Sequence, residues 1–220
     1  MSERLLIVIA LAACGHRSAS APPASGSGSA QPPPPHVAVA DAAAPALAVS
    51  RQGLGPLGKF EWWKQDEDAT AKKIATALAA LPGISVTFDV MDVPGDVERE
   101  EGYWSVKRKD TELVAVLRQE GDKGETPAAV IVWTAEIPTD DGTRVDDKLG
   151  AVVARHADLA CTYDADGMVA GLVAAPLQCH SAAAPEIIYL VKPPNKEPKT
   201  GALDAKKHGD LEVAGIAHVP

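Results

Sequence analysis

The segment Ile84-Ser85-Val86-Thr87-Phe88-Asp89-Val90 alternates apolar and polar residues without a break. Because successive side chains of a β-strand point to opposite faces, this period of two predicts a strand with one buried face and one face in water. The four apolar residues would point into the core. Turn residues bound the segment on both sides, with Pro82-Gly83 before it and Val93-Pro94-Gly95-Asp96 after it.

Several other segments have strand character. Residues 129–137 hold a longer apolar run around Trp133, which is the candidate central strand. The turn residues Asp164-Ala165-Asp166-Gly167 predict a hairpin between the two strands that flank them. The predicted strands are Tyr103–Arg108, Glu112–Arg118, Ala129–Ile137, Leu159–Tyr163, Met168–Val173 and Glu186–Val191, with Leu211–Val219 as a candidate edge strand.

Two segments, Asp66–Leu81 and Asp146 to about His156, have the period of an amphipathic helix. Acidic residues fill the first turn of the first helix, where they suit the positive end of the helix dipole. Asp146 is expected to cap the second helix. The apolar residues of each helix share one face; they are Ile74, Leu78 and Leu81 in the first helix and Leu149, Val152 and Val153 in the second.

The order of these elements predicts the fold class. Strands come in runs, joined by short turns and interrupted by two helices, which favours an antiparallel sheet over a doubly wound parallel one. We therefore expect a single α+β domain with a mainly antiparallel sheet and two helices packed on one face. Mixed polar and apolar strands indicate that the other face of the sheet is wet.

The first residues of the chain resemble a bacterial lipoprotein signal. An unbroken apolar run, Leu5–Ala10, is followed directly by Leu11-Ala12-Ala13-Cys14. The run is too short to span a bilayer, which takes about 20 apolar residues, but it fits a cleavable signal peptide. Leu11–Cys14 resembles the lipobox, which implies cleavage before Cys14 and acylation of that residue. Gly15 at the next position resembles the outer-membrane default of the family.

This resemblance gives a division of the chain into four parts. Residues 1–13 would be the signal peptide, and residues 14–58, rich in Ser, Gly, Pro and Ala, a disordered tether, because such a composition cannot bury enough apolar surface to fold. Residues 59–193 would form the α+β domain. Residues 194–220 would be a polar C-terminal segment, with the candidate edge strand inside it.

Charge limits the class of partner. The chain has 21 basic and 30 acidic residues and a net charge of −9. Nucleic acid is not expected as a partner, because its phosphates need a basic surface. The membrane contact that we expect is the lipid at Cys14, which would hold the protein in the cell envelope, with the domain facing the periplasm or the cell surface.

Cys161 and Cys179 are the only cysteines after Cys14. In an oxidising envelope two such cysteines usually pair, so a disulfide is the main expectation. Zinc held by Cys161, Cys179, His180 and one of His156, His208 or His218 is the alternative. The sequence has none of the short Cys and His spacings that zinc sites usually show.

Asp164 and Asp166 resemble the start of a calcium loop, and they are the weak metal candidates. The full loop needs a Glu at its twelfth position, but Ala175 stands there. A turn explains the two residues better. We expect no cofactor.

The sequence identifies no reaction. A G-x-S-x-G motif is absent, and Ser105, Ser181 and His180 have no distinguishing context. Glu100-Glu101 and Glu136 are the candidate paired carboxylates. The expected function is therefore binding or structural, through contact with a partner protein, cell-wall material or a small molecule. The alternatives are an envelope hydrolase and a calcium-binding or metal-binding module.

Overall fold

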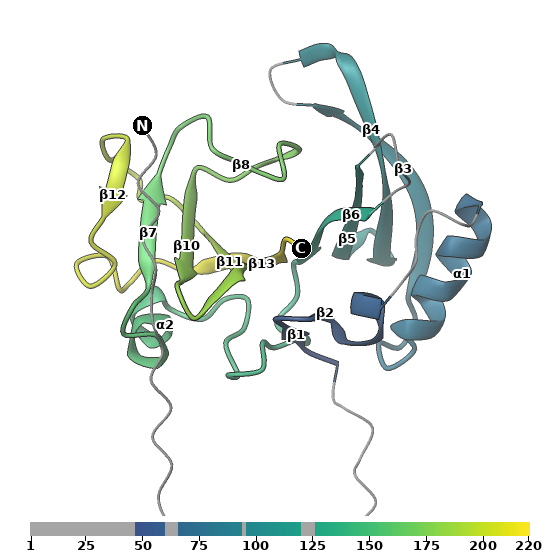
Figure 1. The fold of residues 1–220 in the computed structure, drawn as a ribbon, viewed down its shortest axis with the longest axis horizontal. Coiled ribbons are helices and arrows are strands. Elements are labelled where there is room, and N and C mark those ends of the chain that lie inside the picture. Colours follow the sequence, from purple (N-terminus) through teal and green to yellow (C-terminus); the bar gives the residue numbers. More distant parts are fainter. Residues whose placement is uncertain (1–46, 60–65, 94–95, 120–125) are drawn as a thin grey trace, which may run out of the picture. The chain divides into compact units, whose positions relative to one another are not determined.

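A computed structural model describes residues 47–59, 66–93, 96–119 and 126–220 (Figure 1). Its main element is a nine-stranded sheet in the order β12-β7-β10-β11-β13-β6-β5-β4-β3, with all neighbouring strands antiparallel. The strands are β3 (Ser85–Val93), β4 (Asp96–Arg108), β5 (Thr111–Gln119), β6 (Thr126–Val132), β7 (Ala160–Tyr163), β10 (Leu177–Ser181), β11 (Ala184–Val191), β12 (Gly201–Leu203) and β13 (Val213–His218).

Smaller elements complete the described part of the chain. Two short ribbons pair β1 (Val49–Ser50) with β2 (Gly53–Leu54), and β8 (Met168–Val169) with β9 (Val173–Ala174). The α-helices are α1 (Glu67–Ala77) and α2 (Leu149–Arg155), and η1 (Gly55–Lys59) is a 3-10 helix. The predicted antiparallel α+β domain with two helices is confirmed. No helix among the described residues is long and apolar enough to cross a membrane.

Strand β3 forms where the alternating segment predicted it, and it continues to Val93. Val86 and Phe88 pack against the main core, and the Phe88 ring lies edge-on to Trp104 with ring centroids 5.2 Å apart. Val90, predicted to be buried with them, is 56% exposed. At Val90 the strand extends beyond the main core. The next buried side chain along β3 is that of Val93, which packs in the second cluster on the opposite face of the sheet.

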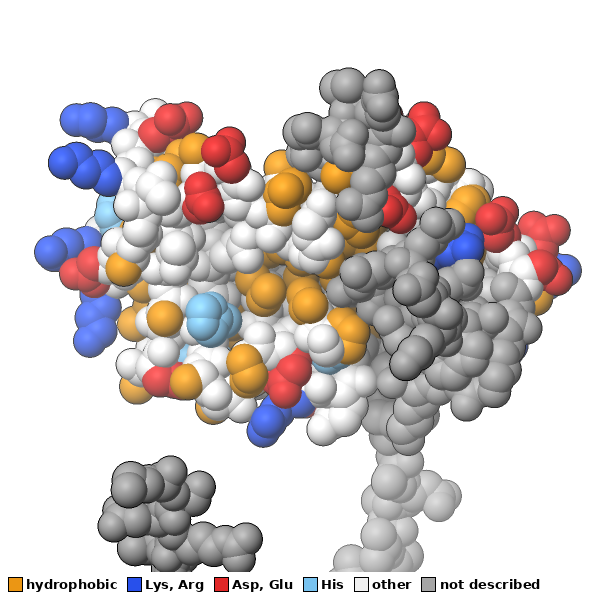
Figure 2. Space-filling model, turned by 45° about the horizontal axis from the view of Figure 1, so that its top comes forward, with side chains coloured by type: hydrophobic (Ala, Val, Ile, Leu, Met, Phe, Trp, Pro, Cys, Tyr) orange, Lys and Arg blue, Asp and Glu red, His pale blue; other side chains and the backbone are white. Residues whose placement is uncertain are grey.

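The centre of the sheet is apolar on both faces. In β6, Val130 and Val132 belong to the main hydrophobic cluster, whereas Ala129 and Ile131 belong to a second cluster with the β8–β9 ribbon. The expected wet face is therefore covered at its centre. Hydrophobic side chains also gather near the middle of the face drawn in Figure 2, and most charged side chains lie toward its edges.

Helix α1 has the predicted start. Asp66 is the N-cap, and its carboxylate accepts a hydrogen bond of 2.7 Å from the backbone N–H of Ala69. Ile74 and Leu78 are fully buried, and Leu81 is buried just after the helix ends. The predicted apolar face of Ile74, Leu78 and Leu81 is therefore buried in the core, although the helix ends at Ala77.

Helix α2 starts later than predicted, and Asp146 does not cap it. Asp146 has a φ of 70°, and its N–H donates to the carbonyl of Val213 at 2.8 Å. The N–H of Val213 donates in return to the carbonyl of Asp147 at 2.9 Å. This pairing with β13 holds residues 146–147 out of the helix, whose N-cap is Lys148. Leu149 and Val152 join the main cluster with Ile74 of α1; the packing of both helices on one face stays a prediction.

The folded part begins earlier than the predicted boundary at residue 59. Val49, Leu54 and Leu57, assigned to the tether, are buried in the main cluster. The N–H of Val49 donates to the carbonyl of Pro138 at 2.8 Å, and the N–H of Asp140 donates to the carbonyl of Val49 at 3.0 Å. Residues 1–46, which hold the predicted signal and most of the predicted tether, lie outside the described residues.

The C-terminal segment also differs from the prediction. β13, which we expected at an edge, lies between β11 and β6, and Ile216 in it is fully buried. The edge strand of this segment is β12 instead. The predicted hairpin over residues 159–173 is wrong as well, because β7 pairs with β10 and β12, whereas β8 pairs with β9.

Candidate functional site

The two predicted disulfide cysteines lie directly opposite each other on neighbouring strands. Cys161 in β7 and Cys179 in β10 are register partners, with 4.0 Å between their Cα atoms and 1.94 Å between their sulfur atoms. Both side chains are buried in the main cluster. This geometry fits the predicted disulfide, which would join β7 to β10.

The predicted zinc ligands are not brought together. Cys179 is buried whereas its neighbour His180 is exposed, as alternation along a strand requires. His156 contacts Asp141 and Tyr189, and His218 lies 3.2 Å from the carbonyl of Arg51. Within the described residues, no group of three or more His, Cys, Asp or Glu side chains could hold a metal ion.

Asp164 and Asp166, the weak calcium candidates, line a pocket instead. The pocket has a volume of about 490 Å³, and its lining residues come from β7, β10 and the segment between them that holds the β8–β9 ribbon. It is lined by Thr162, Asp164, Asp166, Gly167, Met168, Gly171, Pro176, Gln178 and His180. In the described part of the chain, neither carboxylate is paired with a Lys, Arg or His side chain.

Strands β7 and β10 contribute one side of the pocket through the side chains that face away from the cysteine pair. Thr162 and Gln178 are register partners next to Cys161 and Cys179. Gln178 also holds the ribbon, because its side-chain amide donates hydrogen bonds to the carbonyls of Met168 (3.2 Å) and Ala175 (2.9 Å). The pocket therefore has walls that are fixed to each other by hydrogen bonds.

The predicted turn at residues 164–167 forms another wall. The N–H of Gly167 donates to the carbonyl of Asp164 at 2.9 Å, and the N–H of Asp166 donates to the Asp164 carboxylate at 3.2 Å. A Cβ on Gly167 would lie 3.0 Å from the carbonyl oxygens of Asp164 and Ala175. Glycine is thus needed here for close approach of the backbone, and the turn carries both carboxylates to the pocket.

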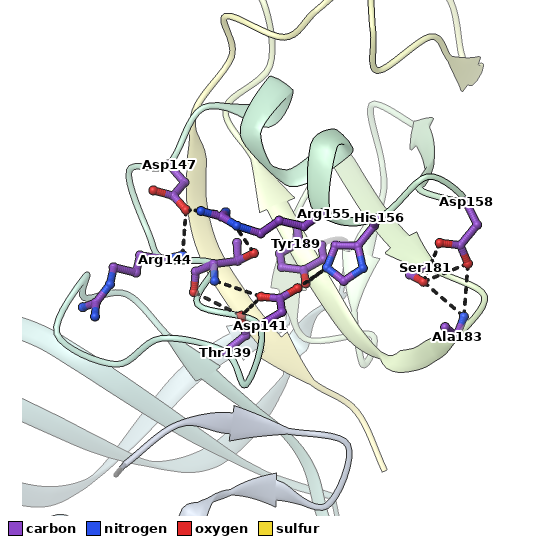
Figure 3. Close-up of polar contacts among 11 residues, drawn as sticks. Thr139, Asp141, Arg144, Asp147, Arg155, His156, Asp158, Ser181, Ala183 and Tyr189 are labelled. Atoms are coloured by element: carbon purple, nitrogen blue, oxygen red, sulfur yellow. Dashed lines mark hydrogen bonds and ion pairs between the residues drawn. The ribbon is translucent and has the colours of Figure 1, made fainter.

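A second polar cluster joins the loop at residues 138–147 to α2 and β11 (Figure 3). His156, the C-cap of α2, contacts the Asp141 carboxylate through Nε2, and the Tyr189 hydroxyl lies 3.0 Å from the same nitrogen. The carboxylate also accepts hydrogen bonds from the hydroxyl of Thr139 and, at 2.9 Å, from the N–H of Thr143. Burial, with the negative charge of Asp141, raises the pKa of Tyr189 to about 12.

Arginine and serine contacts extend this cluster. Arg155 donates to Asp147 at 2.9 Å and to the Thr143 hydroxyl at 3.3 Å. Ser181 donates to Asp158, at 2.9 Å from each carboxylate oxygen, and the N–H of Ala183 donates to the same carboxylate at 3.2 Å (Figure 3). The contacts of His156 and Arg155 tie the end of α2 to the loop at residues 138–147, and the contact of Ser181 ties β10 to Asp158.

The candidate hydrolase residues come from β4, β10 and the loop after β6. Ser181 is bonded to Asp158, and buried Ser105 donates to Glu112, so neither hydroxyl contacts a histidine. Glu136 accepts two hydrogen bonds from Arg108, at 2.6 and 3.1 Å. Glu101 is buried, whereas Glu100 is exposed. His180 lines the pocket.

Sequence reasoning missed the other pocket residues and the cluster around His156. Thr162 and Gln178 meet only because β7 pairs with β10. Asp141, His156 and Tyr189 come from a loop, a helix end and a strand. No motif or spacing connects such residues, and the one local signal was the turn that carries Asp164 and Asp166.

Comparisons with known proteins identify a fold and no activity. No protein-family model matches the chain, and no curated protein matches it. A crystal structure of the uncharacterized protein yfeY from Escherichia coli is similar, with a TM-score of 0.52 and 18% sequence identity. The match covers 79% of this chain and 99% of that chain. At this identity the likeness shows a common fold alone.

Proposed function

We propose that this chain is a lipid-anchored protein of the cell envelope that binds a small molecule in the pocket between β7, β10 and the β8–β9 ribbon. Cys14 would carry the lipid. The Ser-, Gly-, Pro- and Ala-rich residues that follow it would separate the domain from the membrane. Gly15 favours the outer membrane, with the domain in the periplasm or at the cell surface.

One observation carries this proposal: the cysteine pair lies directly beneath the pocket. Thr162 and Gln178, which line the pocket, are next to Cys161 and Cys179 on the same two strands and face the other way. A disulfide there would fix the separation of the two strands that bear the pocket. Disulfides persist in oxidising compartments, so this arrangement supports the envelope address that the lipobox resemblance implies.

The size and form of the pocket support binding. Its volume of about 490 Å³ lies within the range of about 300–1,000 Å³ that is typical of small-molecule sites. The Gln178 hydrogen bonds join β10 to the ribbon. Walls that are joined by hydrogen bonds within the protein lose little conformational entropy when a ligand binds.

The anchor is tested by expressing the full chain in a bacterium fed an alkyne analogue of palmitate. We expect label on the wild-type protein, and no label and a soluble protein for Cys14→Ala. The matched control is the double variant Cys161→Ala/Cys179→Ala, which keeps Cys14 and should keep the label. Label on the Cys14→Ala variant, or membrane partitioning without label, would overturn the anchor.

The compartment is tested on the same cells by alkylating free thiols before and after reduction, followed by mass spectrometry. Cys161 and Cys179 should react only after reduction. Two thiols that react in the unreduced protein would contradict an oxidising location. Binding is tested separately, as described below.

A further inference from the structure

The charges that line the pocket have one sign. Among the described residues that line it, Asp164 and Asp166 are the only carboxylates, and none is a Lys or Arg. A ligand with a positive charge would meet a favourable potential here, and an anion an unfavourable one.

The remaining lining residues offer hydrogen bonds and one apolar surface. The polar side chains along β7 and β10 are those of Thr162, Gln178 and His180. The side-chain N–H groups of Gln178 already donate to carbonyls of the ribbon segment. Met168, on the ribbon, is 38% exposed and is among the few exposed large hydrophobic residues described. Its thioether side chain suits contact with methylene groups.

From this combination we propose that the pocket binds a small aliphatic amine, whose ammonium group pairs with Asp164 and Asp166 while its methylene chain lies against Met168. The inference rests on the proposed function, because it assigns a ligand class to the same pocket. An ammonium group donates up to three hydrogen bonds, which suits carboxylate and hydroxyl acceptors around one point.

A bare metal ion fits the pocket less well. Calcium takes six to eight oxygen ligands, whereas the described lining supplies two carboxylates, one of which already accepts the N–H of Asp166. In the described part of the chain, no group of three or more His, Cys, Asp or Glu side chains could hold a metal ion. An organic cation needs fewer charged contacts and uses the apolar wall as well.

The test is isothermal titration of the full chain, in detergent, with 1,4-diaminobutane. 1,4-Butanediol and butyrate serve as probes of similar length without the positive charge. We expect binding of the diamine only, and weaker binding as salt rises from about 20 to about 150 mM, because salt screens exposed charges. The double variant Asp164→Asn/Asp166→Asn should bind about tenfold more weakly or not at all. The matched control, Asp110→Asn, changes an exposed acid in the β4–β5 turn and should bind like wild type.

Because Asp164 belongs to a turn, a second variant leaves that turn intact. His180→Lys adds a positive charge at an exposed position of the lining and should abolish diamine binding without lowering the melting temperature. Equal binding of the diol would overturn the amine inference and leave the proposed binding function standing. Calcium binding that needs Asp164, without any binding of the diamine, would have the same meaning. Absence of diamine binding to the wild-type chain would also overturn the inference, whereas the anchor depends on the Cys14 label alone.

Discussion

The hydroxyl oxygen of Tyr189 lies 3.0 Å from Nε2 of His156, although the two residues are 33 positions apart in the chain. Tyr189 is 2% exposed and lies in β11, whereas His156 is the C-cap of α2. Because His156 also contacts Asp141, this pair connects the sheet, the helix and the loop at residues 138–147. We expect the contact to contribute to stability rather than to catalysis.

Tyr189→Phe removes the hydroxyl and keeps the ring. A buried hydrogen bond of this kind contributes about 1 kcal/mol, so the free energy of unfolding in urea should fall by about that amount. Tyr163→Phe is the matched control, because Tyr163 is also buried but no hydrogen bond of its hydroxyl is found among the described residues. Equal losses in the two variants would mean that the contact with His156 contributes nothing specific.

Cys161→Ala/Cys179→Ala should lower the free energy of unfolding by about 2–4 kcal/mol, because a disulfide restricts the unfolded chain. The cysteines are 18 residues apart, a moderate loop.

The same double cysteine variant should bind 1,4-diaminobutane more weakly at a temperature where it is still folded, since the pair lies beneath the pocket. Unchanged stability after reduction of the wild-type chain would show that the bond is absent or unimportant. Cys14→Ala, measured in parallel, should leave unfolding unchanged.

Glu212 provides a prediction about pH. Hydrogen bonds from Lys192 and Lys148 to its carboxylate lower its pKa to about 2, from a usual value of 4.5. A lowered pKa in the folded state means that the carboxylate stabilises the fold fully above pH 4.5, and that this contribution is lost as the pH falls toward 2. Stability should therefore fall over this window more steeply in wild type than in Glu212→Gln. The control Asp210→Asn changes a neighbouring acid and should show the same pH dependence of stability as wild type. If stability falls with pH equally in wild type and Glu212→Gln, the lowered pKa of Glu212 does not stabilise the fold.

The elements that sequence predicts well are those whose cause is local. The alternation in residues 84–90 and the acidic start at Asp66 each specify a strand or a helix within one segment, and β3 and α1 form there. Asp146 was wrongly predicted as a cap because its backbone is bound by Val213, more than sixty positions away. The turn at residues 164–167 was recognisable, but its strands pair with partners that no local signal identifies.

The candidate site also combines features that the sequence predicts locally with features that depend on long-range strand pairing. Cys161 and Cys179 were paired by composition alone, since no other cysteine follows Cys14. Their position beneath a pocket depends on the β7–β10 register, which sets Thr162 opposite Gln178 on the other face. Asp164 and Asp166 were singled out for calcium by a partial motif; their placement beside Met168 and His180 instead gives an acidic pocket with an apolar wall.

The boundary of the folded part gives the last prediction. Residues 47–58 were assigned to the tether because residues 14–58 as a whole are rich in Ser, Gly, Pro and Ala, yet Leu54 and Leu57 are buried in the main cluster. Leu57→Ala should cost about 2–5 kcal/mol, the usual range for emptying a buried leucine site. Pro56→Ala, at the exposed neighbouring position, is the control and should change stability little. A chain that begins at residue 59 should melt at a lower temperature than one that begins at residue 47, because it lacks the β1–β2 ribbon and its contacts with residues 138–140. Equal melting of the two chains, together with a neutral Leu57→Ala, would restore the boundary that composition predicts.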